Sequence, residues 1–213
     1  MKKVSIFILI IILLSFIISI YAYQTLEVDK IASHWNVKGE VDDYMGKFWG
    51  LFFLPVITIG LYLLFLLIPK IDPLKNNITK FRKDYDMFIF TFVLFMLYVH
   101  LLTIFANFGN SFNMGTVLMP AIGIWFFYLG SIMKQLKRNW FIGVRTPWTL
   151  SSDKVWEKTH KFASKIFKVW GGLIILTIFI PAEYSIWVIL VSSFIVLIWI
   201  VLYSYLEFRK EKK

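Results

Sequence analysis

The stretch VSIFILIIILLSFIISIYAY, residues 4–23, decides the fold because it contains no charged side chain. A helix needs about 20 mainly apolar residues to cross the hydrocarbon core of a bilayer. The apolar region of a signal peptide is only about 7–15 residues long, and no small-x-small cleavage site follows this stretch. We therefore expect residues 4–23 to form a retained membrane span.

Five further apolar runs follow, and 59% of the chain is apolar. They cover residues 48–68, 87–108, 117–133, 166–181 and 186–206. Within a bilayer each segment must satisfy its own backbone hydrogen bonds, and the runs are continuously apolar rather than alternating, which argues against a barrel. The sequence predicts an all-α integral membrane fold, a bundle of six transmembrane helices.

The positive charges predict the orientation of this bundle. Of the 23 Lys and Arg residues, only Lys30, Lys38 and Lys47 fall outside the segments assigned to one side. Because cytoplasmic loops carry an excess of Lys and Arg, we expect both the N and the C terminus in the cytoplasm. The net charge is +10, and the cations that produce it lie next to spans, where they can interact with anionic lipid headgroups. We therefore expect membrane lipids as partners and no direct contact with nucleic acid.

Two polar segments are too long to be simple connectors, and functional residues concentrate in such loops. Pro69 and Pro73 also interrupt helix between the second and third spans. We expect a two-span module, 1–86, with an external loop, 24–47, and a cytoplasmic connector, 69–86, followed by a four-span module, 87–213, with a cytoplasmic loop, 134–165.

The external loop has the composition of a turn-rich polar segment. Gly39 tolerates positive φ, and Asn36 bonds readily to nearby backbone. His34 and Trp35 lie close in sequence to a cluster of acidic residues that includes Asp42. Two interpretations remain: a loop anchored in headgroups by Trp35, or a recognition surface for a cationic or amphipathic ligand. One histidine near carboxylates falls short of a metal site.

The cytoplasmic loop contains NWFIGVRTPWTLSS, residues 139–152. Ser151 or Ser152 is a good helix N-cap, and Asp153 suits the positive first turn. The helix that starts there is expected to run into the fifth span with lysines on one side. The opposite side carries an apolar stripe at helical spacing: Trp156, His160, Ala163 and Phe167.

This loop also allows two interpretations. In the first it is an interfacial elbow that holds the fourth and fifth spans in place. In the second it is a docking surface for a cytoplasmic protein, because Arg145 between Trp140 and Trp148 has the composition of an interface hot spot.

No catalytic motif is present, and we expect no enzyme activity, metal or cofactor. The chain has no cysteine and lacks the HExxH, GxSxG and P-loop patterns. A transporter is the main alternative, with His100 and Asn107 on one face of the third span, although a histidine bonded to a neighbouring helix is the simpler interpretation. An enzyme using Arg145 and His160 on headgroup phosphates would lack paired acid and base groups.

Residues 139–160 closely resemble the signature of the SdpI family of membrane immunity proteins. The external His34-Trp35-Asn36, followed by Gly39 and Asp42, is also similar to the first extracellular loop of that family. The resemblance implies protection from a secreted toxic peptide, with a cytoplasmic repressor protein held at the membrane as a further partner.

The resemblance also implies which residues bind. Toxin binding falls on the external residues His34, Trp35, Asn36, Gly39 and Asp42. Partner binding falls on the cytoplasmic residues Trp140, Gly143, Arg145, Thr146, Pro147, Trp148, Trp156 and His160. No catalytic residue is implied.

Overall fold

The computed structural model describes residues 2–212 and consists mainly of long helices. Six helices are long and apolar enough to cross a membrane, which confirms the predicted six-helix fold class. The elements are α1 (Lys2–Thr25), β1 (Lys30–Trp35), β2 (Val41–Gly46), α2 (Lys47–Ile71), α3 (Lys75–Lys80), α4 (Arg82–Asn107), α5 (Met114–Met133), α6 (Pro147–Ser151), α7 (Asp153–Leu176), the 3-10 helix η1 (Thr177–Phe179) and α8 (Ala182–Glu211).

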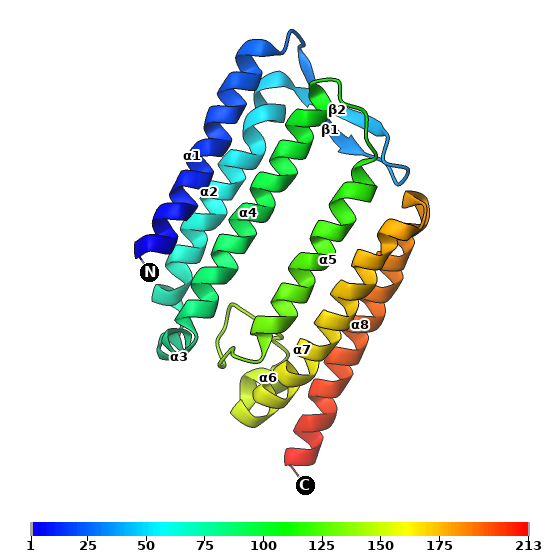
Figure 1. Cartoon of the computed structure of the whole chain (residues 1–213). Helices are drawn as coiled ribbons and strands as arrows, with labels where there is room; N and C mark the ends of the chain where they lie inside the picture. Colours follow the sequence, from blue (N-terminus) through cyan, green and yellow to red (C-terminus); the bar gives the residue numbers. More distant parts are fainter. Residues whose placement is uncertain (1, 213) are drawn as a thin grey trace.

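The six long helices pack in two groups of three (Figure 1). Helices α1, α2 and α4 contact one another, and α5, α7 and α8 do the same, while α4 and α5 share a smaller contact. Many large apolar side chains are exposed along these helices, as expected where lipid is the solvent. The division of the chain near residue 86 remains a prediction.

The most extensive contact joins α5 and α7, and glycines make it possible. A Cβ added at Gly171 would lie 2.5 Å from the backbone nitrogen of Phe127, and one at Gly123 would lie 2.7 Å from the carbonyl oxygen of Gly171. The hydroxyl of Ser164 donates to the carbonyl of Gly130 at 2.5 Å. Small residues allow this close approach of two backbones, as is common between membrane helices.

The segment that we expect to be external, 24–47, is more ordered than a turn-rich loop. Strands β1 and β2 pair as an antiparallel hairpin, with an irregularity between Ala32 and His34. The hairpin packs on α2, because Ile31 is fully buried and a Cβ at Gly50 would lie 2.5 Å from the Ile31 Cβ. This small sheet positions the first candidate site.

One expectation about the connector is wrong. Helix α2 continues through Pro69 to Ile71, because the Phe65 carbonyl, which Pro69 leaves without a backbone donor, accepts instead from the Tyr85 hydroxyl at 2.6 Å. The helix ends at Asp72, whose φ of −64° and ψ of 125° are extended, as favoured for a residue before proline such as Pro73.

The two polar regions lie at opposite ends of the bundle. Figure 1 shows the hairpin at one end, and α3, α6 and both ends of the chain at the other. This separation is what the predicted sidedness requires, although which end faces the cytoplasm remains a prediction.

Candidate functional site

The turn of the hairpin is held by one asparagine side chain and one glycine. The Oδ1 atom of Asn36 accepts hydrogen bonds from the backbone N–H groups of Lys38, at 2.9 Å, and Glu40, at 3.1 Å. Gly39 has a φ of +79°, a conformation that costs glycine little. Both residues therefore act as the sequence indicated, by shaping the turn.

Two polar side chains, one at the end of α4 and one at the start of α5, hold the hairpin against the bundle. Asn107 bonds to the backbone of Ala32, and the amide of Asn113 donates to the carbonyl of Lys38 at 2.5 Å. Gly39 also makes room for this contact, since a Cβ there would overlap with the side chain of Asn113. The hairpin thus has a defined position over the ends of the helices.

An open cavity of about 450 Å³ lies between the hairpin and the adjacent ends of α5 and α8. His34, Trp35, Asn36 and Asp42 line it, and Nδ1 of His34 lies 2.6 Å from Oδ1 of Asp42. Gly39 does not line the cavity. The structure therefore brings four of the five external candidate residues to one cavity, which we call the hairpin groove.

Sequence reasoning missed the other wall of the hairpin groove. That wall is largely apolar and comes from helix ends: Met114, Leu118, Met119 and Ile186. Met114 and Leu118 recur at helical spacing, but the same spacing marks any face of a spanning helix. These residues line the groove only because the hairpin lies over the ends of α5 and α8, which are distant from it in the sequence.

At the opposite end, Thr146 acts as the N-cap of the short helix α6. Its hydroxyl accepts from the N–H of Thr149 at 3.2 Å, and its own N–H donates to the Thr149 hydroxyl at 2.9 Å. Pro147 follows at the first helical position, where its missing N–H costs no hydrogen bond. Helix α7 then begins at the predicted place, with the hydroxyl of Ser152 accepting from the N–H of Val155.

Trp156 and His160 are buried under this loop, and the exposed Gly143 lies directly against the His160 ring. Gly143 has a φ of +104°, and a Cβ there would overlap with Nε2 of His160. That nitrogen accepts from the N–H of Val144 at 3.0 Å, while the His160 ring stacks on Trp156 with centroids 4.0 Å apart. Trp156 and His160 are each 1% exposed, so their contacts lie within the chain.

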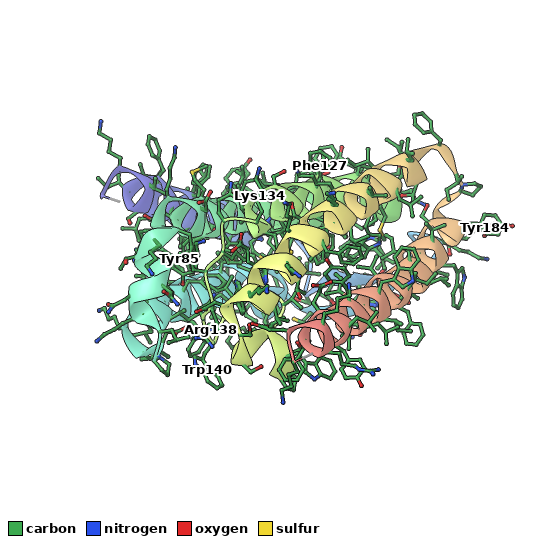
Figure 2. The ribbon with its side chains drawn as sticks, turned by 90° about the horizontal axis from the view of Figure 1, so that it is seen from below. Tyr85, Phe127, Lys134, Arg138, Trp140 and Tyr184 are labelled. Carbon is green, nitrogen blue, oxygen red and sulfur yellow. The ribbon has the colours of Figure 1, made fainter. Side chains whose placement is uncertain are left out.

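Only some of the candidate partner-binding residues in this loop are exposed. Trp140 is 50% exposed and Arg145 is also exposed, whereas Trp148 is half-buried against the Tyr205 ring, with centroids 5.0 Å apart. Figure 2, viewed from this end, shows Arg138 and Trp140 between the short helix α3 and helix α7. A partner would meet Trp140 and Arg145 first.

The connector 69–86 holds this loop from the other group of helices. Asp72, which is 2% exposed, accepts from the N–H of Trp140 at 2.9 Å through Oδ2 and from the N–H of Leu74 at 2.6 Å through Oδ1. The side chain of Asn77 donates to the carbonyl of Arg138 at 2.9 Å. These bonds place residues 138–140 relative to both groups of helices.

The buried His100 has a partner on a neighbouring helix. Its Nε2 lies 3.1 Å from the hydroxyl of Ser19 in α1, and that hydroxyl also bonds to the carbonyl of Leu51 in α2. The geometry therefore supports a structural role for His100, as a histidine bonded to a neighbouring helix, over a role in transport. Asn107, the other candidate for transport, is engaged with the hairpin.

Among residues 2–212, no group of three or more His, Cys, Asp or Glu side chains is arranged to hold a metal ion. The His34–Asp42 pair is exposed and supplies two such side chains.

Fold and sites together define a multi-pass membrane protein with an open groove at one end and an ordered polar loop at the other. Residues 135–204 match the SdpI/YfhL protein family, and residues 10–59 match a domain of unknown function, DUF1648. Immunity protein SdpI of Bacillus subtilis strain 168 is 31% identical over 210 residues, which cover 99% of this chain and 98% of that protein. The chain belongs to the SdpI/YfhL protein family, as the resemblance indicated. No solved structure matches it.

Proposed function

We propose that this chain is a membrane immunity protein, which protects its cell from a secreted toxic peptide by binding that peptide in the hairpin groove. The observation that carries the proposal is the similarity to Immunity protein SdpI along nearly the whole chain. The groove adds a surface of suitable size, since ligand sites commonly enclose about 300–1,000 Å³.

The chemistry of the groove favours an amphipathic peptide with positive charge. Apolar side chains from α5 and α8 would take up apolar residues of the peptide. The hairpin carries Glu40, Asp42 and Asp43, whose carboxylates would attract cationic residues and speed their approach. Because exposed charges are screened by salt, binding is expected to weaken as ionic strength rises.

A peptide challenge tests the proposal. Cells that express the chain are expected to survive a dose of toxin that lyses cells with empty vector. Leu118→Trp places a large ring in the hairpin groove and should remove protection. Leu190→Trp makes the same change at an exposed α8 position outside the groove and should keep it. Equal killing with and without the chain would exclude immunity, and full protection by Leu118→Trp would exclude this groove.

The loop at the other end favours a second role, which we propose as a receptor that holds a cytoplasmic repressor protein at the membrane when toxin is bound. Trp140 and Arg145 are exposed on a loop that hydrogen bonds keep in place, as expected for a docking surface. Toxin changes this surface only if it binds two states of the bundle with different affinity.

Recruitment to membranes tests this second role. Cytosol from expressing cells is mixed with membranes that contain the chain, with and without toxin, and the retained regulator is measured. Trp140→Ala should abolish toxin-dependent retention. Trp187→Ala, which removes a similarly exposed ring at the opposite end, should not. Retention that is the same with Trp140→Ala would leave the loop with a structural role only.

A further inference from the structure

A second large cavity, of about 510 Å³, lies in the group formed by α5, α7 and α8. Among residues 2–212, those that line it come from α5, α7, α8 and the segment 143–146, and none comes from α1, α2 or α4. The cavity is therefore formed by one group of helices and the loop before α6, and its positions on α7 and α8 lie within the spanning helices. We call it the flank groove.

The walls of the flank groove are apolar. Phe126, Phe167, Val196 and Ile200 face it from three helices. The lining positions on α8 extend from Ser193 to Val201, which is about 12 Å of helix. In a membrane the open side of such a groove meets lipid chains, and apolar walls favour an apolar occupant there.

One end of the flank groove is cationic. Arg145 lines this end, and its Nη1 donates to the carbonyl of Trp140 at 2.8 Å. No carboxylate within residues 2–212 forms an ion pair with Arg145. A guanidinium has five N–H donors, so most of them remain for an anion with the geometry of a phosphate.

We propose that the flank groove binds an anionic phospholipid, with an acyl chain along α8 and the phosphate on Arg145. An apolar groove that ends in an unpaired cation matches both parts of such a molecule. A free phosphate would leave the apolar walls unused, and a peptide segment would bring backbone groups that these walls do not satisfy. The proposal is independent of toxin binding, which concerns the opposite end of the bundle.

Lipid retention tests the proposal directly. The full chain is reconstituted in nanodiscs of phosphatidylglycerol and phosphatidylcholine, extracted in mild detergent, and its bound lipid is measured by native mass spectrometry. The wild type should retain phosphatidylglycerol selectively. Arg145→Gln should reduce that retention about fivefold, the effect of one cation near a headgroup. Arg209→Gln removes the same charge from an exposed α8 position outside the flank groove and should leave retention unchanged.

Two further variants distinguish binding of the lipid's acyl chain from binding of its headgroup. Val196→Trp fills the groove and should lower retention of both lipids, whereas Arg145→Lys keeps the charge and should retain more phosphatidylglycerol than Arg145→Gln. If Val196→Trp does not fold, the three Arg145 proteins still decide the question. Equal retention by wild type and Arg145→Gln would overturn the proposal. Displacement of the lipid by millimolar inorganic phosphate would also overturn it, because the site would then be one for a free anion.

Discussion

The side chain of Asn107, at the end of α4, hydrogen-bonds both backbone groups of Ala32 in strand β1. Its Oδ1 accepts from the Ala32 N–H at 2.8 Å, and its Nδ2 donates to the Ala32 carbonyl at 3.2 Å. The amide thereby occupies the outer edge of β1 in place of a third strand. An unpaired edge is a site for unwanted association, so this contact both positions and protects the hairpin.

Asn107→Ala should loosen the hairpin without unfolding the bundle. Two hydrogen bonds that each contribute about 0.5–1.5 kcal/mol are lost, so local opening should become easier by about 1–3 kcal/mol. Amide hydrogen exchange across residues 30–46 would measure this. Asn110→Ala removes an amide that bonds to the carbonyl of Phe105 and should leave exchange in the hairpin unchanged. Unchanged exchange in Asn107→Ala would mean that the contacts with α2 and with Asn113 are enough to hold the hairpin.

Asp72→Ala should weaken the connection between the two groups of helices. The change removes the acceptor of the N–H groups of Trp140 and Leu74, and each lost hydrogen bond costs about 0.5–1.5 kcal/mol. We expect a lower midpoint of thermal unfolding in detergent and faster proteolysis within residues 134–146. Glu157→Ala, at an exposed position on α7, is the control and should behave as the wild type.

Gly143→Ala should be among the most damaging small substitutions in the loop. The residue has positive φ, and the added methyl carbon would overlap with the His160 ring nitrogen. Backbone strain of about 1–3 kcal/mol and a broken Val144–His160 hydrogen bond should together lower stability. Gly172→Ala adds the same carbon where nothing lies within 4 Å, and it should be neutral or stabilising because alanine favours helix. A wild-type melting curve for Gly143→Ala would contradict the described loop.

The absence of cysteine allows a direct test of sidedness. Single cysteines introduced at the exposed positions Lys38 and Lys154 can be labelled on intact cells with a thiol reagent that does not cross membranes. We expect Lys38→Cys to react at once and Lys154→Cys to react only after permeabilisation, because positive charge favours the cytoplasmic side. Labelling of both positions in intact cells would remove the assignment of toxin and repressor sites to opposite sides.

The sequence predicted the six helices because the length of an apolar run is a local property, and a run long enough to cross a bilayer must form a helix to satisfy its backbone hydrogen bonds. It also predicted an N-cap at Ser151 or Ser152, of which the structure uses Ser152, and the turn at Asn36 and Gly39, because these features depend on neighbours a few residues away. The hairpin was not predicted as paired strands. Its stability depends on Ile31 packing against α2 and on the side chain of Asn107, and both contacts join distant segments.

The candidate sites were only partly predicted, because some of their residues come together only through contacts between distant segments. Trp156 and His160 fell on an apolar helical stripe, and the structure buries both side chains. The resemblance named them as partner-binding, and that role stays a prediction. The groove wall at Leu118 and Ile186 arises only when the hairpin is folded over the helix ends, and local periodicity carries no information about that contact.

The glycine contact between α5 and α7 has a mechanical consequence. With the Gly171 backbone pressed against Phe127, neither helix can rotate or slide without steric overlap, so the pair moves as one stiff unit. Helix α5 has 20 residues and a length of about 30 Å, close to the thickness of the hydrocarbon core. A tilt imposed at Met114, beside the hairpin groove, would therefore move α7 together with α5, and Pro120, which removes one helical hydrogen bond, is the position within α5 where a bend would reduce the movement that reaches Met133.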